Sequence, residues 1–225
     1  MKRSRSFSNI LAWLSFALGA AFLALLAALH FLEPEFDPSW RLISEYERGE
    51  YGWVMSLAFF CLGGSTLALL AAIWPSLRTL PGKIGRLWLG LIALAYFGAG
   101  IFISQDINAT QTTLSEDLHN LCGVIVIFTF PIAASLVASS LGRSLEWTAS
   151  RRRLLRYTLI AWLGLLVFLG SLVYFAQIST SDTYGPEFAI GWPNRFLMVT
   201  YAVWLMAVAW RASAAARDDP LQRLG

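Results

Sequence analysis

Residues 104–131 read SQDINATQTTLSEDLHNLCGVIVIFTFP and give the clearest indication of how this chain folds. The stretch begins as a polar loop and continues directly into an apolar helix. Asp106, Glu116, Asp117 and His119 fall in its first part, although only 14% of the chain is charged. We therefore expect this stretch to form the outer end of a helix bundle, where any chemistry would be placed.

The composition indicates that lipid surrounds most of the chain. Of the 225 residues, 57% are hydrophobic, and the mean hydropathy is +0.59. Soluble domains average about 45–50% apolar and about 25% charged residues, so a soluble core of this length could not bury so much apolar surface. The two cysteines, Cys61 and Cys122, lie inside apolar runs and indicate no disulfide framework.

The predicted fold is all-α: a polytopic bundle of six transmembrane helices, forming a single integral membrane domain over residues 1–225. Each apolar segment is long enough to cross a hydrocarbon core of about 30 Å, or nearly so. Thr113, followed three residues later by Glu116, is the capping-box pattern of a helix start, here that of the fourth helix. The six segments lie at about residues 10–32, 53–74, 87–103, 116–141, 157–177 and 195–210.

The basic residues predict the orientation. Both ends of the chain and the second and fourth loops hold fourteen of the seventeen Lys and Arg residues, and the other three loops hold most of the acids. Loops rich in Lys and Arg stay on the cytoplasmic side, so both termini are expected in the cytoplasm. This distribution also explains the pI near 9 without a nucleic-acid partner. The predicted location is a cell membrane, crossed several times, and specifically a bacterial inner membrane.

Titratable groups are expected to gather at the outer helix ends. His30 lies near the end of the first helix, and His119 lies in the first turns of the fourth. Loop residues and the start of the sixth helix are expected at the same depth. The candidate ligand-binding residues are His30, Ser44, Asp106, His119 and Arg195.

Two kinds of chemistry fit these residue types. Imidazole and carboxylate groups can bind a divalent metal such as Zn²⁺, and a bound metal can activate water, so His30, His119 and Asp106 are candidate ligands. The same groups can act as acid and base, which makes His119, Asp117 and Asp106 the catalytic candidates. No established catalytic, metal-binding or nucleotide-binding motif accompanies them.

A purely structural interpretation of these groups is the main alternative. Acids in the first turn of the fourth helix would complement its dipole. The two histidines would pair with loop carboxylates. Arg195 would pair with Glu187 or Asp106. On this interpretation the outer end has no ligand.

The pattern resembles an uncharacterised family of bacterial and archaeal six-helix membrane proteins, catalogued as domain of unknown function 998. The resemblance rests on Ile-Ser-Glu at residues 43–45, Tyr-Gly at 51–52, Asp106, and Leu-His at 118–119. The loop departs from the expected pattern at residues 47–49, where a glycine would come sooner. The resemblance implies a six-helix bundle and no established activity.

The function predicted from these observations is the binding of a lipid head group or amphiphile at an outward-facing polar site. One alternative is a membrane-embedded, metal-dependent lipid hydrolase. A transporter or a structural subunit of a membrane complex is the other. Because no span carries an acid, Lys or Arg near its middle, an ion-coupled transporter is disfavoured. The expected partners are membrane lipids and either another membrane protein or a second copy of this chain.

Overall fold

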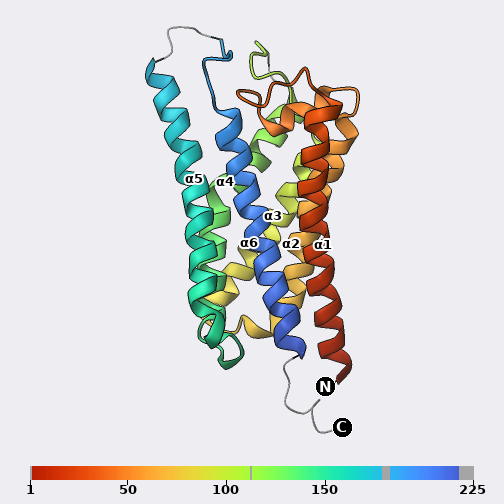
Figure 1. Cartoon of the computed structure of the whole chain (residues 1–225), viewed down its shortest axis with the longest axis vertical. Helices are drawn as coiled ribbons and strands as arrows, with labels where there is room; N and C mark the ends of the chain where they lie inside the picture. The colour runs from red at the N-terminus through yellow and green to blue at the C-terminus, as the bar shows by residue number, and fades with distance from the viewer. Residues whose placement is uncertain (1, 112, 179–182, 218–225) are drawn as a thin grey trace.

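The computed structural model describes residues 2–111, 113–178 and 183–217, and this part of the chain is helical with connecting loops. Short 3-10 helices lie in three of the connections, at Ile43–Arg48 (η1), Trp74–Ser76 (η2) and Leu145–Ser150 (η3). The six long helices are α1 (Lys2–Leu32), α2 (Gly52–Ile73), α3 (Leu80–Ile101), α4 (Leu114–Leu141), α5 (Arg151–Ile178) and α6 (Gly191–Arg217) (Figure 1).

These six helices are all long and apolar enough to cross a membrane. The predicted all-α bundle of six transmembrane helices is therefore confirmed. The first turns of α1 and the last turns of α6 lie at the same end of the bundle (Figure 1). Which side of the membrane this end faces stays a prediction.

Several helices extend beyond the predicted apolar segments. The third begins at Leu80 rather than near residue 87, because Thr79 caps it by accepting a hydrogen bond from the Gly82 N–H at 3.2 Å. Proline in the first turn also favours this start, since the N–H that it lacks would have no partner there. The sixth begins at Gly191 rather than near residue 195. Arg195 therefore lies inside α6, one turn from its start.

The helices pack as a closed ring in chain order. Each of α2, α3, α4 and α5 contacts the helices before and after it, and α6 returns to pack along α1. Aromatic side chains pack among the aliphatic ones in the interior, where Phe130 of α4 stacks on Tyr201 of α6 with ring centroids 4.2 Å apart. Trp204 meets the same phenylalanine edge-on at 5.6 Å. The ring order brings the first and last helices into direct contact.

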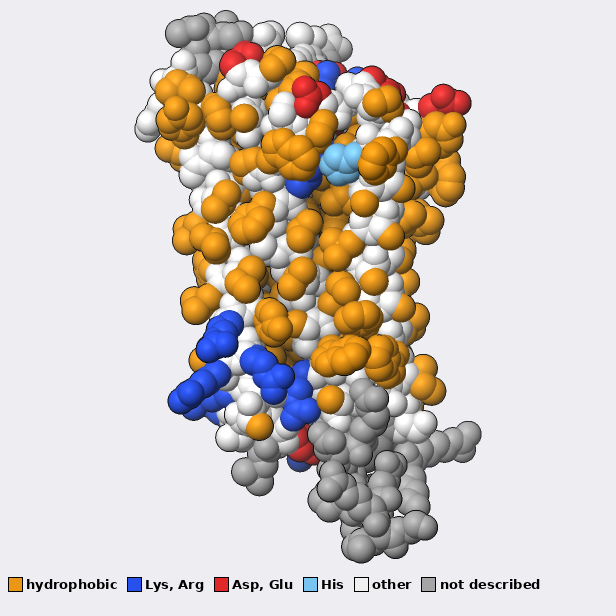
Figure 2. Space-filling model, in the orientation of Figure 1, with side chains coloured by type: hydrophobic (Ala, Val, Ile, Leu, Met, Phe, Trp, Pro, Cys, Tyr) orange, Lys and Arg blue, Asp and Glu red, His pale blue; other side chains and the backbone are white. Residues whose placement is uncertain are grey.

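Charged side chains divide between the two ends of the bundle. Figure 2 shows Lys and Arg side chains gathered at the end where α1 begins, acidic side chains at the opposite end, and hydrophobic side chains between them. Within the described residues, Glu146 is the one acid at the basic end. The end with the acids, which holds η1 and loop residues 102–111, is called the outer end below.

Candidate functional site

The first outer loop folds back over the outer end of the bundle. Its 3-10 helix η1 packs against α2 and α6 and buries Ile43, Glu45, Tyr46 and Glu47. Two hydrogen bonds, each donated by a backbone N–H, attach this loop to the start of α6. The Ile43 N–H donates to Oδ1 of Asn194 at 3.1 Å, and the Gly191 N–H donates to the Ser39 carbonyl at 3.0 Å. The loop therefore forms part of the protein core.

Arg195 is buried at the centre of this arrangement, with 4% of its surface exposed. Its Nε–H donates to Nε2 of His30 at 3.0 Å. Its Nη1 group donates to the carbonyls of Arg41 and Gly191, at 2.7 and 3.1 Å. The Nη2 group donates to the Tyr46 hydroxyl at 3.0 Å. The guanidinium group therefore joins α1, the first outer loop and α6.

His30 is the acceptor in its contact with Arg195. Its other ring nitrogen, Nδ1, lies 2.7 Å from the Leu26 carbonyl and donates to it. The imidazole is thus neutral, with its proton on Nδ1. The expected partners of Arg195 were wrong: the arginine binds neither Glu187 nor Asp106, because α6 packs against α1 and brings it to His30.

Asp106 belongs to an ion-pair network that is separate from the bonds of Arg195. Its Oδ2 accepts from Arg41 at 3.1 Å and from Arg48 at 2.9 Å, and Arg41 also bonds Glu45 at 2.7 Å. Partial burial acts to raise the pKa of Asp106. Hydrogen bonds from the Asn108 N–H and from the two guanidinium groups outweigh burial, so the pKa lies below its ordinary value.

Glu47 is a buried acid that the sequence analysis did not single out. Its Oε2 accepts from the Ser104 N–H at 3.1 Å, and its Oε1 lies 3.4 Å from the Ser56 hydroxyl. Burial raises its pKa to about 8, because an ionised carboxylate is poorly solvated there. Nδ1 of His119 lies 3.5 Å from Oε2 but donates to the Phe102 carbonyl at 2.7 Å.

A cavity of about 280 Å³ lies beneath η1, between α3, α4 and α6. Most of its lining is apolar, from side chains such as Phe59, Val126 and Met198. It is open beside α4, because a Cβ atom added to Gly123 would meet no atom within 4 Å and the neighbouring Val124 is exposed. An apolar cavity that opens on the flank of a membrane helix is accessible to lipid.

Polar atoms without partners gather in this cavity. No hydrogen bond within the described part of the chain is made by the Ser44 hydroxyl, Nε2 of His119, the side-chain amide of Asn120 or the Tyr96 hydroxyl. Asn194 also lines the cavity and uses its Oδ1 atom on η1. No Asp, Glu, Lys or Arg lines the cavity in the described residues. These side chains can bind a neutral, hydrogen-bonding group.

The predicted site residues thus fall into three groups. Ser44 and His119 line the cavity, His30 and Arg195 bond each other, and Asp106 lies in the arginine network. The catalytic candidate Asp117 is exposed in the first turn of α4. In the ranges that the structure describes, no three His, Cys, Asp or Glu side chains gather closely enough to hold a metal ion. His30, His119 and Asp106 are therefore not brought together.

Tyr96, Asn120 and Asn194 complete the cavity and were missed from the sequence. Tyr96 sits inside an apolar run, where it has the appearance of a packing residue. Asn194 precedes Arg195 directly, and Asn120 follows His119 directly. The only available signal was this adjacency of amide side chains to two predicted site residues.

Comparison with known proteins identifies one family. The family model described as "Protein of unknown function (DUF998)" matches residues 12–211. The resemblance found in the sequence is thereby confirmed over nearly the whole chain. No curated protein and no solved structure matches the chain.

Proposed function

Because the chain belongs to the DUF998 family, whose description assigns no activity, we propose its function from its own cavity. It is an integral membrane protein that binds an uncharged amphiphile of the outer leaflet. The observation that carries this proposal is a group of polar atoms in a largely apolar cavity that have no partner among the described residues, namely those of Ser44, Tyr96, His119 and the exposed Asn120.

Hydrogen bonding favours a ligand in this cavity. A buried polar group left without a partner costs about 1–3 kcal/mol. The Tyr96 hydroxyl is such a group among the described residues, and Nε2 of His119 is an acceptor because its Nδ1 carries the proton. A ligand whose head carries a hydroxyl group or an N–H amide would supply both a donor and an acceptor.

The absence of charge in the lining selects the class of head group. A phosphate or carboxylate placed in this cavity would lose its water without meeting a cation in the described residues, which is strongly unfavourable. A neutral head avoids this loss. Ligand pockets usually measure about 300–1,000 Å³. The cavity of about 280 Å³ therefore fits a head and the first part of a chain, with the remainder in lipid beside Gly123.

The metal-dependent hydrolase is not proposed. His30 accepts a hydrogen bond from Arg195, His119 donates to the Phe102 carbonyl, and Asp106 pairs with two arginines. Each candidate ligand is thus engaged by a different partner. We keep cytoplasmic termini, a bacterial inner membrane, and a membrane-protein partner or second copy as predictions from the sequence.

Photolabelling with a long-chain alcohol that carries a diazirine beside its hydroxyl tests the proposal. Gly123→Leu would place a side chain in the open space of the cavity without a backbone clash. Gly170→Leu is the matched control, because a Cβ there also meets no atom within 4 Å and the position is exposed on α5, outside the cavity. Circular dichroism confirms that both variants fold.

In the unmodified protein we expect the label on peptides containing Tyr96, His119 and Asn194. Labelling of these peptides should fall strongly in Gly123→Leu and persist in Gly170→Leu. Equal labelling of the cavity peptides in both variants, or label spread evenly over the lipid-facing helices, would overturn the proposal.

A further inference from the structure

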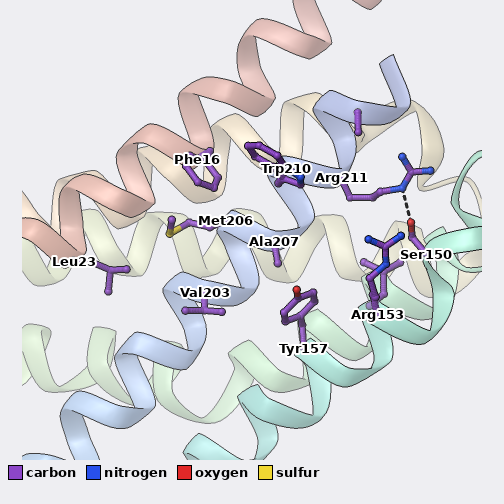
Figure 3. Close-up of a pocket in the computed structure, with 12 residues that line it drawn as sticks. Phe16, Leu23, Ser150, Arg153, Tyr157, Val203, Met206, Ala207, Trp210 and Arg211 are labelled. Carbon is purple, nitrogen blue, oxygen red and sulfur yellow. Dashed lines mark hydrogen bonds between the residues drawn. The ribbon is translucent and has the colours of Figure 1, made fainter. Parts of the chain in front are cut away.

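A second hollow lies at the basic end of the bundle. It has a volume of about 410 Å³ and runs over α6 between α1 and α5. Figure 3 shows Arg153 and Arg211 at one end of it and Leu23 at the other. We call it the arginine groove and define it by Phe16, Leu23, Arg153, Tyr157, Trp210 and Arg211.

The wall of the arginine groove is apolar along α1 and α6. Phe16 packs against Trp210 with ring centroids 5.8 Å apart, and Leu23 continues the same face of α1. Seven residues separate these two α1 positions, which corresponds to roughly 10 Å at 1.5 Å per residue. This length matches the first part of an acyl chain that lies parallel to the helices.

At the charged end of the groove, the cations are paired with no acid among the described residues. Arg211 donates its Nε–H to the Ser150 hydroxyl and its Nη2 group to the Glu146 carbonyl at 3.1 Å, so both contacts are to neutral oxygens. Arg153 is exposed and has no hydrogen bond or ion pair with any residue that the structure describes. The Tyr157 hydroxyl likewise has no such partner and lines the same groove.

The helix that carries Arg153 adds to this positive potential. The first turn of α5 consists of Arg151, Arg152 and Arg153 and contains no acid. A helix N-terminus carries a partial positive charge, so cations there raise the local potential rather than balance it. An anion bound at this point would be stabilised by both the arginines and the helix dipole.

We propose that the arginine groove binds an anionic phospholipid of the inner leaflet. The phosphate pairs with Arg153 and Arg211 and accepts from the Tyr157 hydroxyl, while one acyl chain follows Phe16 and Leu23. Basic pockets between membrane helices on the cytoplasmic side are suited to such head groups. The occupant differs from that of the outer cavity, whose described lining has no charged side chain, so the two proposals stand independently.

Native mass spectrometry of the detergent-purified full chain with dioleoylphosphatidylglycerol tests this proposal. Arg153→Gln removes the cation that has no partner among the described residues. Arg152→Gln is the matched control, since Arg152 is exposed in the same helical turn but does not line the groove. Ala207→Phe leaves every charge in place and fills the groove from α6, where Ala207 is part of the lining.

Arg153→Gln should weaken phosphatidylglycerol binding roughly ten-fold, the equivalent of one charge-assisted hydrogen bond. Arg152→Gln should weaken binding much less than Arg153→Gln does, because Arg152 adds to the potential but does not line the groove, and Ala207→Phe should bind weakly. Dioleoylphosphatidylcholine should bind poorly, and glycerol phosphate should not compete. Equal losses in both arginine variants, unchanged binding by Ala207→Phe, equal binding of phosphatidylcholine or full competition by glycerol phosphate would each overturn the proposal.

Discussion

The Nε–H of Arg195 on α6 donates to Nε2 of His30 on α1, at 3.0 Å, across 165 positions of sequence. The contact requires a neutral imidazole, and the bond from His30 to the Leu26 carbonyl holds the proton on Nδ1. A buried cation is thus satisfied by four neutral acceptors, from His30, Arg41, Gly191 and Tyr46. The planar fork of arginine makes this possible.

Arg195→Lys should therefore lower the unfolding temperature even though it preserves the charge. An ammonium group cannot reach the same acceptors, and each one left unpaired in the core costs about 1–3 kcal/mol. Unfolding in detergent can be followed by tryptophan fluorescence. Arg48→Lys is the control, because Arg48 is about one-third exposed and its ion pairs contribute at most about 1 kcal/mol. Equal losses of stability in the two variants would contradict this account.

Because burial raises the pKa of Glu47, we predict that its contribution to stability falls as the pH rises. Its pKa rises from 4.5 to about 8 on burial, so between these pH values the folded state holds a proton that the unfolded state has released. The contribution of Glu47 to the free energy of unfolding is most favourable below pH 4.5 and is lost as pH rises to about 8. Each unit by which the folded pKa exceeds the unfolded pKa corresponds to about 1.4 kcal/mol.

Glu47→Gln should remove this dependence and stabilise the protein at alkaline pH. Unfolding temperatures of both proteins measured from acidic to alkaline pH would show the difference. Glu187→Gln, at an exposed acid, should keep the slope of the unmodified protein. A Glu47→Gln variant with an unchanged slope would show that the pH dependence has another origin.

Gly191→Ala should weaken the attachment of the first outer loop to α6. A Cβ atom there would overlap the carbonyl oxygens of Pro38 and Arg41, both of which are backbone atoms. We expect a loss of roughly 1–3 kcal/mol of stability from this overpacking. Gly170→Ala meets no atom within 4 Å and should instead stabilise α5 by about 0.5–1 kcal/mol. Shifts of the same sign in the two unfolding temperatures would count against this reading of the close contact.

Single-cysteine labelling can establish the orientation. With Cys61 and Cys122 replaced by alanine, a cysteine at exposed Gln111 reports the outer end, and one at exposed Arg143 reports the basic end. A membrane-impermeant maleimide should label position 111 in intact cells and position 143 only after permeabilisation, because Lys- and Arg-rich loops remain cytoplasmic. The reverse pattern would invert the proposed leaflets of both binding sites.

The six spans and the cap of α4 by Thr113 could be predicted from local sequence. The hydropathy of a segment indicates whether lipid surrounds it, so each span can be recognised by itself. A capping side chain bonds to the first turn of its own helix, so the cap is also a local feature. The predicted starts of α3 and α6 were too late in the sequence. The true starts, Leu80 and Gly191, belong to polar first turns that lie outside the apolar segments used for the prediction. A proline near each start hid the true boundary, although proline is well tolerated in a first helical turn.

The partners of the site residues could not be predicted in the same way. Arg195 finds His30 because α6 closes the ring against α1, and no local pattern specifies that order. Glu47 and Tyr96 were missed for a related reason: burial of a loop acid and an unpaired hydroxyl in an apolar helix both depend on distant neighbours. Ser44 and His119 were placed at the same depth from sequence, and they do share the outer cavity.

The bonds of Arg195 also bear on how the protein is made. His30, Arg41 and Tyr46 all precede α2, whereas Arg195 lies on α6, which is synthesised after the other five helices described here. During biosynthesis the acceptors of Arg195 in α1 and the first outer loop therefore bind water until α6 inserts. The guanidinium group then replaces this water. Completion of the outer end is a late event of assembly. A chain that stalls before its sixth helix would present an open loop to quality-control proteases.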